Sequence, residues 1–268
     1  MSNNQTPDYY IAPKGSFDAT ADAIRAVNGT NQEITWGQNG FADAIGTTRK
    51  YTADEIAYST LTGDVVVNGN GWIKTYAFFG QSGMTSFSAP NATGLGSSTF
   101  QNCSGCTSFY TPKMAELYGS NAFNGCSSVK TLCFPKGGIS SSHSYLYNNA
   151  FSGCTNLETI DLGGITRTGN QTFQNDGKLT TIIFRYVGLV TLGNTNVFTN
   201  TPYAEGGTGG TIYIPKSLYD HLGDGTSNDY KAATNWSIIN GYGTITWAKI
   251  EGSYYETHYA DGTTIPTT

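Results

Sequence analysis

The sequence predicts a β-rich solenoid of short parallel strands, with a small α/β module at its N-terminus. Three observations support this fold class. A phenylalanine recurs through the middle of the 268-residue chain, and the same order of residue types follows each occurrence. Apolar and polar side chains alternate in each expected strand, which is the period of a half-buried strand. Only 12% of the residues are charged and 34 are glycine, a composition that favours a turn-rich β protein.

Each repeat unit is anchored on one phenylalanine. The six anchors are Phe78, Phe100, Phe123, Phe151, Phe173 and Phe198. Three residues after them come Gln81, Cys103, Cys126, Cys154, Asp176 and Thr201. The positions nine and eleven residues after each anchor are mostly apolar and define a strand, and a Gly-Cys-Ser/Thr sequence provides the bend before it. One strand cannot bury its own inner face, whereas stacked units can, so we expect the phenylalanines and cysteines to form ladders along the axis.

The pattern A-F-x-x-C-x-x-L-x-x-I-x-L resembles the BspA-like leucine-rich repeat, of the kind found in phage tail-associated proteins of gut and Gram-positive bacteria. The resemblance covers residues 72–215, as about five units and a capping turn. The following sequence, "YKAATNW" included, is similar to the usual end of such arrays. The resemblance implies a stacked architecture and leaves the activity open, because this repeat serves many binding roles.

The segments on either side of the repeat have a different character. Residues 1–46 are predicted to form a helix, a strand and a second helix. Their sequence motifs "ADAIR" and "FADAIG" resemble those of a small N-terminal module of phage tail-associated proteins. That resemblance implies attachment to a particle or oligomerisation, and the alternative is an N-terminal cap of the solenoid. Residues 47–71 are predicted to be a β-type connector. Residues 216–268 are predicted to be a C-terminal cap with a closing strand and a tail.

Charge and hydropathy exclude several classes of partner. The net charge is −5 and no basic run is present, so we expect no nucleic acid partner. No apolar stretch approaches the ~18 residues of a membrane helix, and the sequence shows no secretory signal or lipid anchor. This profile leads us to expect a phage virion protein, located in the tail or on the particle surface. The alternative location is the bacterial cell surface or the secreted fraction.

Residues with catalytic or metal-binding chemistry are present without a recognisable constellation. Cys103, Cys126 and Cys154 share one repeat position, and Cys106 stands where other units have Met, Val or Leu, so we expect core packing rather than zinc binding. Cys133 is expected to face outward as an exposed thiol. The remaining candidates are three histidines, three carboxylates and a calcium-like loop: His143, His221, His258, Glu116, Glu158, Asp161 and residues 224–229. The histidines and carboxylates show no spacing typical of a catalytic pair, and the loop lacks the glycine and distal glutamate of a calcium motif. We therefore predict no enzyme, no cofactor and no metal.

The outward-facing side chains of the strands are the best candidates for binding. In parallel strands, equivalent positions lie side by side about 4.8 Å apart. The expected outward strip consists of Tyr110, Asp161, Ile183, Arg185 and Tyr213, with Ser88 and Cys133 in the same row. The insertion at residues 137–149 is expected to project as a loop that presents Tyr145 and Tyr147.

These observations predict a non-enzymatic, tail-associated virion protein whose repeat surface binds a host-cell glycan or protein. Its N-terminal module would contact other virion proteins, and many copies would act together as a homo-oligomer. The alternatives are a bacterial cell-surface adhesin with the same repeat and a purely structural decoration of the particle. A glycan hydrolase is the least supported alternative.

Overall fold

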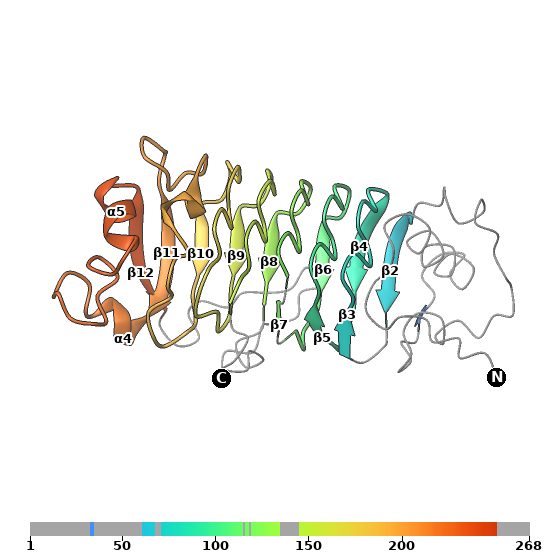
Figure 1. Cartoon of the computed structure of the whole chain (residues 1–268), viewed down its shortest axis with the longest axis horizontal. Coiled ribbons are helices and arrows are strands. Elements are labelled where there is room, and N and C mark those ends of the chain that lie inside the picture. The colour runs from blue at the N-terminus through green and yellow to red at the C-terminus, as the bar shows by residue number, and fades with distance from the viewer. Residues whose placement is uncertain are drawn as a thin grey trace, which may run out of the picture.

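The computed structural model describes residues 33–34, 61–67, 71–114, 116–117, 119–134 and 145–250. Within these ranges the chain is a solenoid whose strands lie side by side along one long axis (Figure 1). The predicted β-rich solenoid with parallel strands is therefore confirmed. The helices predicted in the N-terminal module and the tail after residue 250 lie outside the described residues.

One row of parallel strands runs along the main face of the solenoid (Figure 1). It consists of β1 (Glu33–Ile34), β2 (Gly63–Val67), β4 (Met84–Ser88) and β6 (Ser108–Tyr110) in a four-stranded sheet, and of β8 (Thr131–Cys133), β9 (Thr159–Asp161), β10 (Thr181–Ile183), β11 (Gly210–Pro215) and β12 (Ile245–Ile250) in a five-stranded sheet. Every ladder in both sheets is parallel. The row thus begins before residue 72 and continues beyond residue 215, the limits that the sequence repeat predicts for the solenoid.

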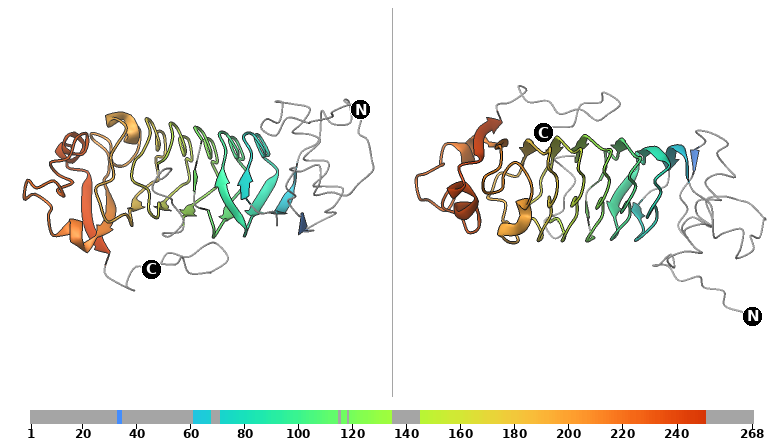
Figure 2. Two further views of the ribbon diagram at one scale, coloured as in Figure 1. Left: turned by 60° about the horizontal axis from the view of Figure 1, so that its bottom comes forward. Right: turned by 90° about the horizontal axis from the view of Figure 1, so that it is seen from above.

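A second, shorter row completes each coil of the solenoid. It contains β3 (Gly71–Ile73), β5 (Ala92–Leu95) and β7 (Glu116–Leu117), again paired in parallel. It is continued by single bridges from Tyr145 to Arg167 and from Arg167 to Thr191. Figure 2 shows the coils from two further directions.

The turn after each anchor phenylalanine has the same backbone conformation in every unit. The residues two positions after the anchors are Gly80, Asn102, Gly125, Gly153, Asn175 and Asn200, and all have positive φ, between 58° and 79°. Glycine adopts this left-handed conformation without strain, and asparagine tolerates it better than most other residues. The recurring glycine or asparagine therefore follows from the backbone that the unit requires.

The anchor phenylalanines stack through the centre of the solenoid. Successive ring centroids lie 5.4, 5.2, 5.5, 5.7 and 5.6 Å apart from Phe78 to Phe198, with interplanar angles of 28° or less. All six rings are buried. Because each ring contacts those of the neighbouring units, the ladder couples the units along the axis.

The position three residues after each anchor forms a second ladder. The thiols of Cys103, Cys126 and Cys154 donate to the carbonyl oxygens of the previous anchors, at 2.9, 3.1 and 3.2 Å. Asp176 occupies the same position in the fifth unit and is fully buried. Neither of its carboxyl oxygens has a hydrogen-bond partner within the described part of the chain. Asp176 is thus a member of the ladder whose buried polar atoms lack hydrogen-bond partners among the residues described.

The cap, defined here as residues 216–250, closes the C-terminal end of the described chain (Figure 1). It contains α4 (Lys216–Tyr219), α5 (Trp236–Gly241) and β12, and follows the 3₁₀ helix η1 (Thr195–Phe198) and β11. The indole of Trp236 lies 6.0 Å from the ring of Phe198, the last anchor. The phenylalanine ladder therefore ends against the cap. None of the helices in the ranges described has the length and apolar character needed to cross a membrane.

Candidate binding site

The predicted outward strip has the expected register but not the expected exposure. Cys133, Asp161, Ile183 and Tyr213 are direct partners on successive strands, and Ser88 pairs with Tyr110. Asp161 and Ile183 are fully buried, and Arg185 and Cys133 are 5% exposed. The prediction that these four side chains are exposed is therefore wrong. Ser88, Tyr110 and Tyr213 are half-buried.

An ion pair explains much of this burial. Arg185 donates from Nε to Oδ2 of Asp161 at 2.7 Å, and its terminal nitrogen lies at the same distance. The other carboxylate oxygen of Asp161 accepts the N–H of Gly163 at 3.0 Å. Because a buried charge requires such partners, the two side chains satisfy one another rather than a ligand.

The thiol of Cys133 packs beside Tyr110 and apart from the main core. Burial raises the pKa of this thiol. Tyr110, Cys133, Asp161, Arg185 and Tyr213 also make further interactions, so the strip is not an open surface. The role in receptor binding that the sequence suggests for the strip stays a prediction. The burial of the side chains at the centre of the strip argues against binding there.

Tyr145 and Tyr147 lie on the solenoid rather than in a projecting loop. Tyr145 pairs with Arg167 in the second row, Leu146 is buried in the core and Asn149 has the positive φ of a repeat turn. The prediction of a projecting loop is therefore wrong for residues 145–149, and the rest of the insertion lies outside the described residues. The cause is that the insertion ends earlier than its spacing suggests, so the next unit already begins at Tyr145.

The two tyrosines form an aromatic pair on this surface. Their ring centroids lie 4.5 Å apart, and the two hydroxyl groups are in direct contact. Both side chains are half-buried, and the neighbouring Arg167 and Thr191 are exposed. We call these four residues the tyrosine patch. It combines ring surface, hydroxyl groups and one cation across three adjacent units.

Glycines beside Tyr147 let the units that carry the patch approach one another closely. A Cβ on Gly169 would lie 2.5 Å from the carbonyl carbon of Tyr147, and one on Gly193 would lie 2.7 Å from that of Gly169. The backbones of three units therefore approach too closely here for any side chain. Gly169 and Gly193 therefore allow the three units that carry the patch to stack closely.

The four core cysteines pack as the sequence predicts. Cys103, Cys106, Cys126 and Cys154 are fully buried free thiols. Burial raises the pKa of each, to about 12 for Cys106. A thiol held protonated is a poor metal ligand and a poor nucleophile. Among the residues described, no three His, Cys, Asp or Glu side chains gather in a way that could hold a metal ion.

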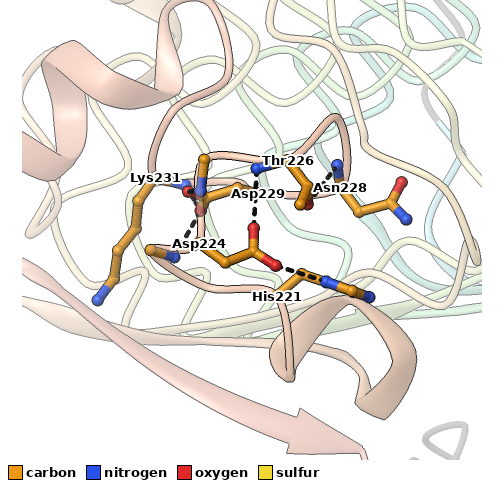
Figure 3. Close-up of polar contacts among 8 residues, drawn as sticks. His221, Asp224, Thr226, Asn228, Asp229 and Lys231 are labelled. Atoms are coloured by element: carbon orange, nitrogen blue, oxygen red, sulfur yellow. Dashed lines mark hydrogen bonds and ion pairs between the residues drawn. The ribbon is translucent and has the colours of Figure 1, made fainter.

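The loop at residues 224–229 directs its oxygens to backbone N–H groups (Figure 3). Asp229 accepts from Gly223 and Lys231 through Oδ1, both at 2.8 Å, and from Gly225 through Oδ2 at 3.1 Å. Asp224 accepts from the backbone of Thr226 at 2.8 Å. These carboxylates brace the loop, which supports the interpretation of a polar turn over that of a calcium site.

The histidines and carboxylates do not assemble into a catalytic arrangement in the described residues. His221 has a carboxylate partner that its spacing did not suggest, since Nδ1 lies 2.6 Å from Oδ2 of Asp224. The backbone N–H of Thr226 and then His221 lower the pKa of Asp224 to about 2. Glu158 is exposed, 3 residues before the paired Asp161. His143 and His258 lie outside the described residues, and so does the side chain of Glu116.

A pocket in the cap was not predicted from the sequence. It has a volume of about 580 Å³ and is lined by Tyr219, Leu222, Lys231, Asn240, Ile245 and Trp247. We call it the cap pocket. The sequence segments "YKAATNW" and "ITWAKI" contain three of these residues. Nothing in the spacing of the lining residues along the chain indicates that α5 and β12 bring them together.

The chain was compared with known protein families, curated proteins and solved structures. Residues 71–205 match the family described as the BspA type leucine rich repeat region, in 6 copies. A leucine-rich repeat protein from Bacteroides ovatus is 20% identical, with a TM-score of 0.40 over 69% of this chain and 43% of that chain. A leucine rich cell surface protein from Faecalibacterium prausnitzii is 15% identical, with a TM-score of 0.34 over 59% of this chain and 56% of that chain. The matched regions thus span about half of each of those two chains. No curated protein gave a significant match.

Proposed function

This chain belongs to the BspA-type leucine-rich repeat family, and from that premise we propose that it is a non-enzymatic binding protein that recognises a receptor on a host cell. The receptor is a surface glycan or protein. The tyrosine patch is the observation that carries the proposal, because it places two aromatic rings and an exposed arginine on adjacent units.

The composition of the patch suits recognition. Tyrosine and arginine are enriched among the residues that contribute most to binding energy. Tyr145 and Tyr147 hold each other in place by ring and hydroxyl contact, so little side-chain freedom is lost when a partner binds. Gly169 and Gly193 let the units that carry the patch stack closely, which brings Tyr147 and Arg167 onto neighbouring coils.

We propose a phage particle as the setting, with the chain in or on the tail. The support comes from the N-terminal segment, which resembles a module of tail-associated proteins, and from the low-charge composition rich in Gly and Tyr. Many copies on one particle would turn weak single contacts into stable attachment. The same surface would also serve a bacterial cell-surface adhesin, and a structural decoration protein would need no receptor.

The test is binding of the labelled full chain to intact gut bacterial cells. We expect saturable binding to some strains, reduced by about tenfold or more in a Tyr147→Ala, Arg167→Ala double variant. Lys130→Ala, an exposed cation on the same solenoid, is the matched control and should bind as the unchanged chain does. Equal binding by all three proteins would contradict the role of the patch.

A second measurement separates the settings. Quantitative mass spectrometry would compare purified phage particles with washed bacterial envelopes for peptides of this chain. Enrichment in particles supports the virion protein, and enrichment in envelopes supports the adhesin. Enrichment in particles without binding to any strain, together with defined multimers, would support the decoration protein.

A further inference from the structure

The cap pocket lies where the solenoid ends. Tyr219 is the last residue of α4, Asn240 belongs to α5, and Trp247 belongs to β12. Trp247 pairs in register with Ile212 of β11, which is fully buried, so both side chains point toward the core side of the sheet. In the described chain β12 is the last strand of the row, and Trp247 is accordingly only half-buried. The pocket thus lies between β12 and the cap residues of α4, α5 and their connecting loop.

The indole of Trp247 is held in a fixed orientation. Its Nε1 donates to Oδ1 of Asn240 at 2.8 Å, and Nδ2 of Asn240 donates to the carbonyl oxygen of Trp236 at 3.0 Å. The ring packs against Tyr230 and Trp236, with centroids 5.0 and 5.6 Å away. A ring fixed in this way can receive a flat apolar face without losing side-chain freedom.

Polar groups converge on the same pocket. The backbone of Lys231 is fixed by Asp229, which also holds the loop at Gly223 and Gly225 (Figure 3). The Lys231 side chain is exposed and can offer three N–H donors. The amide oxygen of Asn240 accepts one hydrogen bond from Trp247, so it can accept one more.

From this arrangement we propose that the cap pocket binds a saccharide. A pyranose ring has a face of C–H groups, which packs on an indole, and a rim of hydroxyl groups, which would pair with Lys231, Asn240 and the phenol of Tyr219. The volume of about 580 Å³ lies within the ~300–1,000 Å³ typical of small-ligand pockets. A purely apolar ligand would leave the ammonium and amide groups unpaired, at a cost in free energy.

The saccharide site is separate from the tyrosine patch. Its residues lie in the cap, whereas the patch lies on the second row of the repeat units. Saccharide binding here names a ligand class for a host-recognition protein and in that sense rests on the proposed function. Binding at each of the two sites can nevertheless be disproved separately.

The experiment is saturation-transfer NMR on the full chain with methyl glycosides of glucose, galactose, N-acetylglucosamine and glucuronic acid. We expect transfer to the ring protons of at least one glycoside, with a dissociation constant on the order of 1 mM, as for a single contact site. Lys231→Ala should weaken this binding by about fivefold, the effect of one lost hydrogen bond of ordinary strength. Trp247→Leu should abolish it.

Controls keep the result interpretable. Lys178→Ala removes an exposed lysine from a repeat turn and should leave the transfer unchanged. Circular dichroism shows whether Trp247→Leu remains folded, and Lys231→Ala provides the test if it does not. The proposal is overturned if no glycoside receives saturation, or if binding persists unchanged in Lys231→Ala and in folded Trp247→Leu. The Tyr147→Ala, Arg167→Ala variant should keep full binding to the glycoside, which separates this result from the cell-binding test.

Discussion

The repeat units and the cap reach a closed core by different means. In the units one set of contacts recurs: anchor rings stack, and the N–H groups of the anchor and of the residue two positions later donate to the next unit, as in Phe123 and Gly125. In the cap each contact occurs once, such as the 2.6 Å hydrogen bond from Nε1 of Trp236 to the carbonyl oxygen of Val190. A recurring contact can be recognised from its spacing in the sequence, and a single contact cannot.

This difference predicts how far the effect of a substitution extends through the molecule. A lost contact in the middle of the stack weakens both neighbouring units, because each unit is buried only by its neighbours. A lost contact in the cap should stay local unless it reaches Trp236. The changes below test this contrast.

The largest effect should come from the centre of the ladder. Phe151→Ala removes a fully buried ring that stacks on Phe123 and Phe173, and we expect it to lower the free energy of unfolding by about 3–5 kcal/mol. Chemical denaturation gives this value. Hydrogen exchange should show lost protection in the units on both sides. Phe79→Ala, at a residue that is 37% exposed, is the control and should have a much smaller effect.

Protection lost only within the unit of Phe151 would show that the units are not coupled through their rings. In that case the contrast between a cooperative stack and a local cap would not hold.

An intermediate effect should come from Asp176, where stability depends on pH. Burial raises the pKa of this carboxyl well above its ordinary value. The nearby backbone N–H groups of Cys154 and Gly153 donate to other carbonyl oxygens and only partly oppose the shift. The folded state therefore keeps its proton as the pH rises above the unfolded pKa of about 3.9, and stability falls with rising pH up to the folded pKa. Asp176→Cys restores the residue of the ladder. We expect it to raise stability at pH 8 by about 1–3 kcal/mol.

The cap should respond to pH in the opposite direction. Burial alone would raise the pKa of the Asp229 carboxyl. The hydrogen bonds that it accepts from three backbone N–H groups outweigh burial, so the pKa is lowered. Its contribution is thus present above the unfolded pKa and is lost as the pH falls through the folded pKa. Denaturation from pH 4 to 8 measures the Asp176 slope. Exchange of the Gly223, Gly225 and Lys231 amides, followed as the pH is lowered below about 4, measures the loss of the Asp229 contribution. A slope at Asp176 that the cysteine variant leaves unchanged would contradict the protonated carboxyl.

The smallest effect should come from the repeat turn. At Gly153, with φ of 79°, an added Cβ would meet only ordinary contacts at 3.7 Å, so the cost of Gly153→Ala is conformational. We expect a loss of about 1–2 kcal/mol in global stability. Gly225 in the cap also has positive φ and open space, and Gly225→Ala should disturb only its loop. Gly177→Ala, at ordinary φ with nothing within 4 Å, should be neutral, and thermal unfolding of all three variants checks the order.

The architecture could be predicted from the sequence because every repeat unit shows the same spacing of residue types. The anchors, the cysteine position and the alternation within each strand together predicted parallel strands in register, and the ladders of β8 to β11 have that register. The same alternation indicated the closing strand, which is β12. These features depend on spacing alone, which a single sequence displays.

The site could be predicted only in part, because exposure depends on particular partners. Asp161 and Arg185 have the positions that the register predicts, yet their mutual ion pair buries both. Tyr145 and Tyr147 were identified as candidates, but the length of the insertion concealed that they already belong to a unit. Trp247 and Asn240 are brought together by one turn between α5 and β12, and no periodicity marks such a contact.

The stack also acts as a molecular ruler. Each coil advances the chain by one strand spacing, about 4.8 Å. The cap begins directly after the last unit of the tyrosine patch, where Asn235 and Trp236 donate to the carbonyl oxygens on either side of Thr191. Insertion of one unit of about 22 residues ahead of the cap would increase the separation of the patch and the cap pocket by that fixed step. A receptor that carries two determinants at a set distance could therefore be matched by a change in the number of units, without any new side chain at either site.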